Sequence, residues 1–390
     1  MNQSNILKNS IHQKQSLAKR IQSILRKIRS ESKKSNLNSF SLTEPVFTET
    51  RKTIWDGKLV DRLIIFFRGS GCLWVEKGGG CTFCGFYTAT NQGNKIQDSD
   101  YLTQLENTLT KYKNEIEKFP IISLYNDGSM LSNQEINFSA LLKIIERISK
   151  YPFIKRITLE SKLSDITEEK IKILKNSTDK ELEIALGFES SNPLVRKICI
   201  NKNFSNSHFL KTSEMLNNYN VSIVALMMLG PPFLTESESI QDAIDSLTFL
   251  EKAKIYRIDF ELPTVEKFTL TEILYNNGFY KPLMLWSVTE ILRKKGKLNL
   301  NTPIYISPPR YTVPSISMAS NCALCDLRFF SLIEDYNKNQ NIDIFERDES
   351  KKICQCHAKW ENLLIETKSD LEFLDRVEKI ITRLEMNIEI

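Results

Sequence analysis

The chain has 390 residues, of which 41% are hydrophobic, and its formal net charge at pH 7 is +5. This is enough apolar material for one large domain with an appendage, and the modest charge does not by itself require a nucleic-acid partner. No run of about 18 apolar residues occurs, which argues against a membrane-spanning helix, and Asn, Gln and Lys interrupt the N-terminal segment too often for a signal peptide. We therefore expect a cytoplasmic protein with no membrane contact.

Basic residues crowd the first segment, up to about Leu37, against the lone acidic residue Glu31. Its apolar residues recur at helical spacing, which predicts an amphipathic helix. They are Leu17, Ile21, Ile24, Leu25 and Ile28. Two interpretations stay open: a helix packed on the core with a solvated basic face, or a contact for a nucleic acid or another acidic partner.

Six short apolar runs alternate with helix-like segments such as Glu135–Ser149 and Glu236–Ala253. Their near-continuous hydrophobicity is typical of strands that are buried on both faces. The alternation predicts an α/β protein with a parallel sheet, and six units suit a partial (β/α)6 barrel of the TIM-like type. The runs are Leu63–Phe67, Ile121–Tyr125, Arg156–Glu160, Glu183–Phe188, Val221–Leu229 and Ile255–Leu262.

The pattern changes after about Asn301, where several prolines indicate an irregular link. A cysteine-bearing segment and a closing helix from Asp370 to Leu384 are expected to follow. We therefore divide the chain into a basic N-terminal helical extension (residues 1–54), a barrel (residues 55–301) and a C-terminal metal-binding appendage (residues 302–390).

Three cysteines, Cys72, Cys81 and Cys84, lie in a glycine-rich segment directly after the first predicted strand. Loops that follow the carboxyl ends of parallel strands are where α/β barrels build active sites. Three thiolates can hold three irons of a [4Fe–4S] cubane and leave the fourth iron open for a ligand. Phe83, between the last two cysteines, would shield one side of such a cluster from water.

Two other uses of this cysteine segment remain as alternatives. A zinc site would want a fourth ligand nearby, and no local His or Cys supplies one. A redox pair would need only Cys81 and Cys84, and would leave Cys72 and the glycines without a role. The iron–sulfur cluster explains more of the segment than either.

Polar or glycine residues also end the next four predicted strands, at the edge of the sheet where the cysteine loop is expected. Taken singly, they suit an Asp-Gly turn or helix caps. Taken together, they indicate contacts for a polar cofactor beside the open iron. They are Gly128, Ser129, Glu160, Ser161, Glu189 and Gly230. Glu261 and Arg257, on the sixth strand, are candidates for facing the substrate, although Arg257 could equally face outward.

A second cysteine group lies near the C-terminus, where Cys322 and Cys325 are followed about 30 residues later by Cys354 and Cys356. Two such pairs make a four-thiolate metal site that would tie an irregular tail together. Zinc and an auxiliary iron–sulfur cluster are both compatible with this spacing, and four free buried cysteines are the remaining alternative. The lone Cys199 is expected to be a small core residue.

These features, in this order, resemble the radical S-adenosylmethionine (SAM) subunit of archaeosine synthase and its relatives. The resemblance extends from about Trp55 to Trp360 and includes the tail cysteines. The blocks that carry it are Gly71-Cys72-Leu-Trp74, Gly80-Cys81-Thr-Phe-Cys84-Gly85, Gly128-Ser-Met-Leu131, Gly187-Phe-Glu-Ser190, Pro231-Pro-Phe-Leu-Thr-Glu236 and Tyr280-Lys-Pro-Leu-Met-Leu-Trp-Ser287.

The resemblance implies a partial barrel of the radical SAM type, with a [4Fe–4S] cluster and SAM as cofactors. The reaction would be reductive cleavage of SAM to a 5′-deoxyadenosyl radical, which takes a hydrogen atom from the substrate. In the archaeal members the substrate is a modified guanine in tRNA that bears a lysine adduct, whose C–N bond is broken to leave an amidine. Expected partners are an electron donor such as ferredoxin or flavodoxin, tRNA, and a lysine-transferring enzyme.

One loop departs from the family pattern. Where the family has Arg-Gly-Pro-His before the tail cysteines, this chain has Met318-Ala-Ser-Asn321. The exchange removes an anion contact and a proton donor, so a radical SAM tailoring enzyme for a small metabolite or natural product is the alternative function. A non-enzymatic, zinc-stabilised nucleic-acid-binding module is a third hypothesis, and it would contain zinc but no iron.

Overall fold

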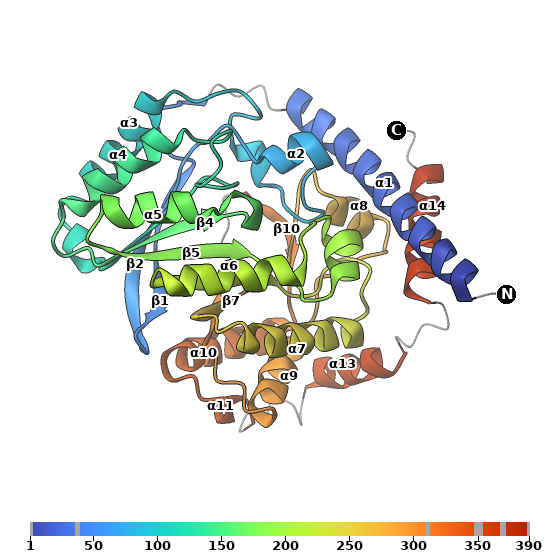
Figure 1. The fold of residues 1–390 in the computed structure, drawn as a ribbon. Helices are drawn as coiled ribbons and strands as arrows, with labels where there is room; N and C mark the ends of the chain where they lie inside the picture. Colours follow the sequence, from blue (N-terminus) through green and yellow to red (C-terminus); the bar gives the residue numbers. More distant parts are fainter. Residues whose placement is uncertain (1–2, 36–39, 309–312, 347–353, 367–371, 388–390) are drawn as a thin grey trace.

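The computed structural model describes residues 3–35, 40–308, 313–346, 354–366 and 372–387. Its centre is an eight-stranded sheet (Figure 1). The first two strands form an antiparallel hairpin, and all later neighbours in the sheet are parallel. In order across the sheet the strands are β1 (Phe47–Trp55), β2 (Lys58–Phe66), β3 (Ile121–Tyr125), β4 (Arg156–Ser161), β5 (Glu181–Gly187), β6 (Val221–Met228), β7 (Arg257–Glu261) and β9 (Ile304–Ser307).

Helical segments connect consecutive parallel strands, as the alternating pattern predicted. Between β2 and β7 they are α2 (Leu73–Gly78), η1 (Phe86–Ala89), α3 (Asp98–Lys111), η2 (Ile116–Lys118), α4 (Phe138–Ser149), η3 (Leu163–Asp165), α5 (Glu168–Ser177), η4 (Val195–Ile200), α6 (Asn206–Asn218) and α7 (Glu236–Lys252). Between β7 and β9 they are α8 (Leu270–Asn276) and α9 (Leu285–Lys297). The α/β partial barrel that the sequence predicted is therefore confirmed.

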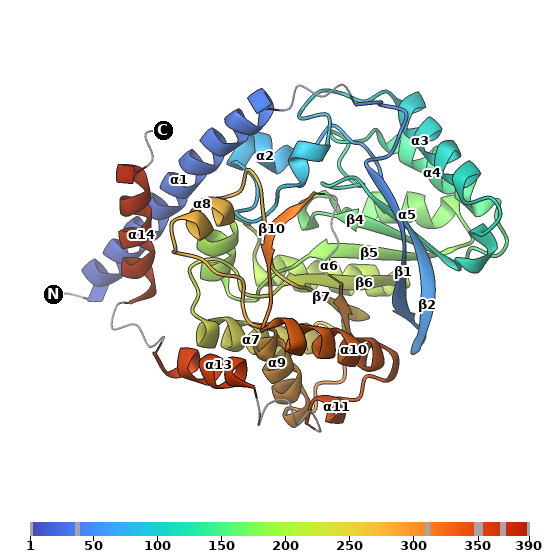
Figure 2. The ribbon, with the colours of Figure 1, turned by 180° about the vertical axis from the view of Figure 1, so that it is seen from behind.

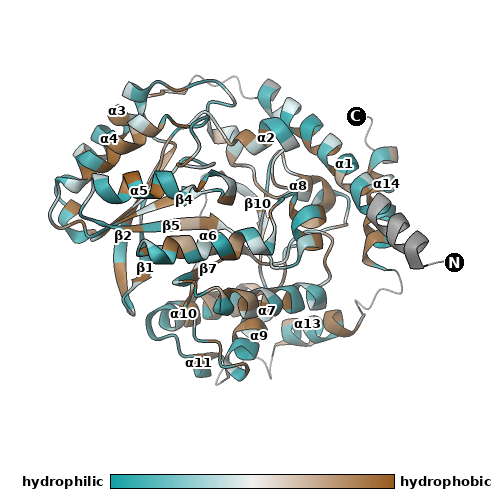
Figure 3. Cartoon of the chain, in the orientation of Figure 1, coloured by the Kyte–Doolittle hydropathy of each residue, from teal (hydrophilic) through white to brown (hydrophobic). Residues whose placement is uncertain are grey.

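Successive residues of each strand face opposite sides of the sheet, and the two sides have different surroundings. One side packs its aliphatic residues against the surrounding helices, for example Ile157 and Leu159 of β4 with Ile144 of α4. Figure 3 shows brown strands at the centre and helices with mixed teal and brown faces, as amphipathic helices require. The other side faces the barrel interior, and polar residues such as Arg62 line it.

The sheet curls until its two ends approach each other. Arg62 on β2 lies 3.8 Å from the carboxylate of Asp259 on β7, although four strands separate β2 from β7 in the sheet. Arg257 of β7 also donates a hydrogen bond of 2.9 Å to the carbonyl of Ile54 on β1. These contacts across the interior make the barrel nearly closed at the end where these residues lie.

The segment that was expected to be an irregular link contains strand β9, which pairs in parallel with β7. The expectation of an irregular link was wrong here, because four buried residues between Thr302 and Pro308 are enough for one short strand. Strand β10 (Ser315–Met318) follows and pairs with β8 (Thr264–Glu266) in a second, two-stranded sheet. The predicted domain boundaries near residues 54 and 301 lie next to β1 and β9, which both belong to the main sheet. The division of the chain into three parts stays a prediction.

The N-terminal helix α1 (Gln3–Ser35) buries the apolar stripe that was predicted for it. It packs against α2, α8, η4 and α14 (Phe373–Asn387), so the first and last of the described helices lie side by side (Figure 2). Helix α14 corresponds to the predicted closing helix, whose first two residues lie outside the described part of the chain. The tail also contains α10 (Ala323–Asn339), α11 (Asp343–Glu346) and α13 (Gln355–Glu366). In the described part of the chain, every helix is too short or too polar to span a lipid bilayer.

Candidate functional site

The three loop cysteines follow β2, at the carboxyl end of the barrel strands. Cys72 immediately precedes α2, while Cys81 and Cys84 lie between α2 and η1. All three are free thiols and partly buried. Phe83 between them packs against the apolar cluster of α1, η4 and α8, and its predicted role as a shield for the cluster stays a prediction.

The backbone of the cysteine loop is held by side chains from elsewhere in the chain. The amide of Asn201, just after η4, donates to the carbonyls of Gly78 and Gly80, at 2.8 and 2.7 Å. In return, the indole of Trp74 donates to the carbonyl of Asn201 at 2.6 Å. Thr82 also donates to the carbonyl of Cys199. The π-helical turn η4 therefore orients the loop, and Cys199 itself is a buried core residue, as expected.

Arg29 of helix α1 makes the most extensive contact with the loop. Its guanidinium donates to the carbonyl oxygens of Gly79, Cys81, Cys84 and Phe268, at distances between 2.6 and 3.2 Å. The side chain is 3% exposed, so this cation is not part of a solvated basic face. Sequence reasoning missed this role, because no pattern separates Arg29 from its basic neighbours.

A positive φ brings the loop close to α1. Gly79 has φ +82°, a conformation that L side chains rarely adopt, and a Cβ there would lie 2.6 Å from Cβ of Leu25. The glycines that follow Cys72 therefore let the loop pack directly onto the N-terminal helix. Helix α1 is therefore part of the framework of this site.

Burial dominates the ionisation of the three thiols. It raises the pKa of Cys72 to about 12, partly offset by Lys162. It also raises the pKa of Cys81, with Lys202 and Arg29 acting in the opposite direction, and the pKa of Cys84, where Arg29 again opposes it. Thiolates in this loop therefore need a bound positive charge, and a metal cluster supplies one.

The ends of β3 and β4 are joined to the cysteine loop by the buried carboxylate of Glu135. It accepts hydrogen bonds from the backbone N–H groups of Leu73 at 2.9 Å and Ser129 at 2.7 Å, and it pairs with the ammonium group of Lys162. Burial raises the pKa of Glu135, and Lys162 opposes that shift. This pair, of the buried Glu135 and the partly exposed Lys162, fixes the residue next to Cys72 relative to two barrel strands.

Three of the predicted cofactor residues take part in this framework. A Cβ at Gly128 would overlap the Glu135 carboxylate, so glycine is required there for close packing. The hydroxyls of Ser129 and Ser161 lie 3.2 Å apart, and Ser129 also accepts from the backbone of Lys162. Their side chains are buried and bonded within the protein.

Glu160, at the end of β4, lies beside Asn126. Its carboxylate accepts from the backbone N–H of Asn126 at 3.3 Å, and burial raises its pKa to about 7. The side-chain oxygen of Asn126 is buried and has no hydrogen-bond partner in the described part of the chain. An orphaned buried acceptor of this kind calls for an external donor.

Glu189 and Gly230 lie further around the same edge. Glu189 has φ +64° and pairs with Lys202 at 2.7 Å, while its second oxygen accepts from the backbone of Met228 at 2.8 Å. The carbonyl of Gly230 accepts from the hydroxyl of Tyr280 at 3.0 Å. The structure thus brings the predicted strand-end residues to one edge of the barrel, and their contact with a cofactor stays a prediction.

The barrel interior below this edge is closed by buried ion pairs. Glu183 of β5 pairs with Arg156 at 3.0 Å and with Arg257 at 3.5 Å. Arg257 also pairs with Asp259 at 2.6 Å, and Arg62 approaches the same carboxylate. Arg257 therefore faces inward, as one interpretation proposed, but carboxylates of the protein neutralise it.

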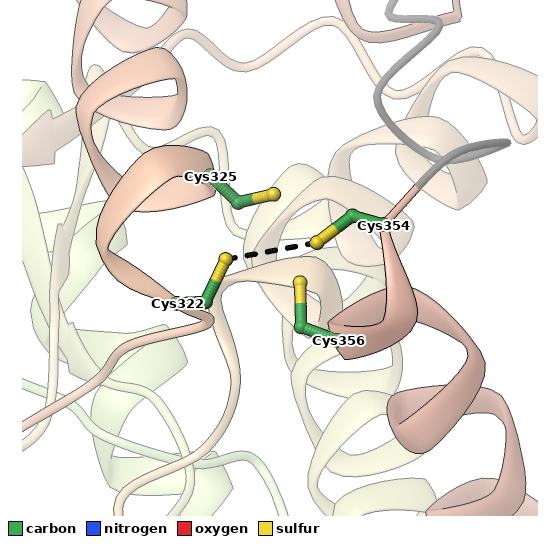
Figure 4. A group of neighbouring side chains, drawn as sticks. All are labelled: Cys322, Cys325, Cys354 and Cys356. Carbon is green, nitrogen blue, oxygen red and sulfur yellow. Dashed lines mark hydrogen bonds between the residues drawn. The ribbon is translucent and has the colours of Figure 1, made fainter.

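The four tail cysteines lie together at the start of α10 and α13 (Figure 4). Their sulfur atoms all lie within 4.8 Å of one another, and those of Cys322 and Cys354 are 3.7 Å apart. Cys325 and Cys356 are buried, and the other two are partly buried. The predicted four-cysteine group is thus assembled, from segments about 30 residues apart.

Comparison with known proteins identifies the family. The Radical SAM superfamily model matches residues 78–247. Archaeosine synthase subunit beta of Methanosarcina acetivorans is 31% identical over 330 residues, which are 82% of this chain and 90% of that protein. The chain belongs to the radical SAM superfamily. Archaeosine synthase subunit beta of Thermococcus kodakarensis is 28% identical over 60% of this radical SAM chain and 72% of its own.

A solved structure is also similar to this radical SAM enzyme. It is queuine lyase from Clostridium spiroforme bound to SAM and queuine, with 17% identity, a TM-score of 0.46, and coverage of 69% of this chain and 98% of that chain. Membership of the superfamily implies a [4Fe–4S] cluster and SAM as cofactors. The third hypothesis, a non-enzymatic zinc module, is therefore wrong.

Several residues of the radical SAM site escaped prediction. They are Arg29, Glu135, Lys162, Asn201, Lys202 and Glu266. Lys162 directly follows Glu160-Ser161, so its place at a strand end was visible in the sequence. Lys202 lies only 13 residues after its partner Glu189. The other four, which are Arg29, Glu135, Asn201 and Glu266, reach the cysteine loop across 50 residues or more, a separation that a single sequence does not reveal.

Proposed function

We propose that Cys72, Cys81 and Cys84 hold the [4Fe–4S] cluster of this radical SAM enzyme. The observation that supports this most is their place on one loop at the carboxyl end of the barrel, with Arg29, Lys162 and Lys202 close enough to oppose the pKa shifts of the thiols. Three thiolates leave one iron open for SAM. When bound, the cluster supplies the electron that splits SAM into methionine and a 5′-deoxyadenosyl radical.

The residues at the ends of β3 and β4 suit direct contacts with SAM. The orphaned oxygen of Asn126 and the neighbouring carboxylate of Glu160 are acceptors for the hydrogen-bond donors of SAM. Glu189, Ser129 and Ser161 are engaged within the protein, and we assign them to positioning this edge. Phe83, Gly128 and Gly230 are proposed to border the cofactor.

The ion pairs below the site have a different role. Glu183, Asp259 and the arginines around them fill the interior and are 1–3% exposed. They would keep bulk water from entering the barrel from that side. Exclusion of water protects a reactive radical from side reactions.

For the substrate, we propose a modified guanine in tRNA, with cleavage of the C–N bond of a lysine adduct. The support is the 31% identity to archaeosine synthase subunit beta over 90% of that protein. Because that relative is a subunit, we also propose a second protein, the lysine-transferring enzyme, as a partner. The electron would come from an external donor such as ferredoxin or flavodoxin.

Helix α1 offers a surface for tRNA even though Arg20 and Arg29 are engaged internally. Arg20 pairs with Glu385 of α14 at 2.6 Å, whereas Lys19, Arg26 and Lys27 are exposed. Phosphate contacts by such cations make binding weaken steeply with salt. A Lys19→Gln, Arg26→Gln, Lys27→Gln variant should bind bulk tRNA more weakly and with a smaller salt dependence in gel-shift titrations.

The matched control replaces with Gln three exposed lysines in or just after α3 and α4, which are Lys113, Lys143 and Lys150. Its tRNA binding should equal that of the wild type. Incubation of the reduced enzyme with lysine-adducted tRNA should then give 5′-deoxyadenosine together with the amidine product. Absence of salt-sensitive tRNA binding by the wild type would contradict the tRNA proposal.

One observation favours the small-molecule alternative. The segment Met318-Ala-Ser-Asn321 replaces the Arg-Gly-Pro-His of the archaeosine synthase pattern, and it lies beside a surface cavity of about 510 Å³ that Tyr275, Phe279 and Lys281 also line. A substrate without phosphates would need no anion contact there. Under this alternative the enzyme still forms 5′-deoxyadenosine but does not bind tRNA.

A further inference from the structure

The geometry of the four tail cysteines separates the metals that their spacing left open. Their sulfur atoms all lie within 4.8 Å of one another, and the Cys322–Cys354 pair is 3.7 Å apart. Zinc binds thiolates at about 2.3 Å in a tetrahedron, which places neighbouring sulfurs about 3.8 Å apart. In a cubane each thiolate binds its own iron, so the four ligand sulfurs lie further apart than around a single ion.

The surroundings of the four sulfurs compensate the charge of a tetrathiolate. Four thiolates around one divalent ion carry a net charge of −2. Cys322 and Cys325 belong to the N-terminal turn of α10, and Cys354 and Cys356 to that of α13. Helices of this length concentrate partial positive charge at their N-termini, here at the sulfurs.

A tryptophan supplies a direct hydrogen bond to the site. The indole N–H of Trp286, on α9, donates to the sulfur of Cys356 at 3.3 Å. Trp286 is 4% exposed, and its ring meets the ring of His357 edge-on at 4.9 Å. A buried N–H aimed at a sulfur suits a thiolate bound to a metal better than a neutral thiol, which accepts hydrogen bonds weakly.

We propose that Cys322, Cys325, Cys354 and Cys356 bind a single zinc ion. Four thiols release their protons to the solvent as the ion binds, so the step involves no change of oxidation state. All four positions of the ion are taken by sulfur, so the site is structural rather than catalytic. This inference is independent of the substrate proposed above.

The zinc ion has a specific structural task, because its ligands adjoin the mouth of the barrel. Asn321, next to Cys322, accepts from the backbone of Trp286 at 3.0 Å. Strand β10 ends just before it and pairs with β8, whose Glu266 accepts from the backbone of Gly85 at 2.6 Å. A continuous path of contacts therefore links the zinc site to the residue after Cys84.

The other half of the site fastens helix α13 to the barrel. The indole of Trp360 donates to the hydroxyl of Ser287 at 2.8 Å, and Ser287 donates to Glu236 at the start of α7. Zinc thus holds α13 and α10 against α7 and α9. It also fixes Met318–Asn321, the segment that departs from the archaeosine synthase pattern, in one position.

The test is metal and sulfide analysis of the full chain, expressed and purified without oxygen. The wild type should contain about four irons, four sulfides and one zinc per chain. A Cys72→Ala, Cys81→Ala, Cys84→Ala variant should keep its zinc and lose its iron. A Cys322→Ser, Cys354→Ser variant should lose zinc and keep the iron and sulfide of the loop.

Cys199→Ala, which removes the cysteine outside both groups, is the matched control and should keep both metals. About eight irons and eight sulfides without zinc would overturn the proposal, as would iron without sulfide at the tail. Zinc that disappears from the loop variant would overturn it too. If the tail variant is insoluble, the wild type and the loop variant decide the question by themselves.

Discussion

The two cysteine sites of this chain are assembled in opposite ways. The loop cysteines come from one short segment and are held through their backbone, by Arg29 and Asn201 from outside. The tail cysteines come from two segments, and their sulfur atoms all lie within 4.8 Å of one another. A loop that is preorganised by the protein can keep an iron open for chemistry, whereas a site closed by four sulfurs only joins two segments.

The largest effect is expected from the buried carboxylate that joins the loop to the barrel. Glu135→Ala removes the acceptor for Leu73 and Ser129 and leaves the Lys162 cation with only its more distant partner, Asp165 at 3.6 Å, at a cost of up to about 5 kcal/mol in the free energy of unfolding. Iron content should fall sharply while zinc is retained, as measured by metal analysis and urea denaturation. Equal loss of iron and zinc would contradict the claim that the two cysteine sites are held independently.

Arg29→Ala should have the next largest effect, about 4 kcal/mol, because four carbonyl oxygens lose a charged donor. Loss of the nearby cation should also make the midpoint potential of the loop cluster more negative, which redox titration detects. Arg26→Ala is the matched control, since Arg26 is exposed and makes one hydrogen bond, to the carbonyl of Lys77. An unchanged midpoint potential and iron content in Arg29→Ala would show that the hydrogen bonds from Arg29 to the cysteine loop are dispensable.

Glu160 is expected to make the free energy of unfolding depend on pH by up to about 3 kcal/mol, because burial raises its pKa to about 7. The folded state favours its protonated form, so stability is greatest below the ordinary carboxyl pKa and declines as pH rises through 7. Glu160→Gln should flatten the change in unfolding free energy of the metal-free protein between pH 5 and 8. Glu146 lies on the exposed face of α4, so the control variant Glu146→Gln should keep the pH dependence of the wild type. A Glu160→Gln pH profile that matches the wild type would contradict the role of Glu160.

The smallest effect concerns the tail alone. Trp286→Phe removes the hydrogen bond to the sulfur of Cys356, and zinc affinity should weaken about 10- to 100-fold in competition with a chelator. Trp360→Phe is the control, because its indole donates to Ser287 rather than to sulfur. Iron at the loop should be unaffected in both variants. Equal zinc affinity in the two variants would contradict the role of Trp286.

The sequence predicted the parts of this molecule that depend on local pattern. Six barrel strands, the apolar stripe of α1 and both cysteine groups follow from periodicity and spacing. The hairpin of β1 and β2 was missed, although its turn at Asp56-Gly57 is a recognisable hairpin signal with two positive φ values. Strand β9 was missed because prolines flank it.

The supporting residues of the site could not be predicted in the same way. Arg29 lies more than 50 residues from Cys81 and Cys84, and Glu266 more than 180 residues from Gly85. Their contacts exist because α1 and β8 pack against the cysteine loop in three dimensions. No local periodicity distinguishes a buried arginine in a basic helix from the exposed Arg26 and Lys27 beside it.

The most direct test of the account is the yield of 5′-deoxyadenosine from SAM under anaerobic reducing conditions. If the loop holds the catalytic cluster, as we propose, the wild type and the Cys322→Ser, Cys354→Ser variant should both form it, whereas Cys81→Ala should form none. If Cys81→Ala still forms 5′-deoxyadenosine, the loop is not the site of the reaction. If the tail variant keeps its loop iron but forms none, the two sites are not separate in function.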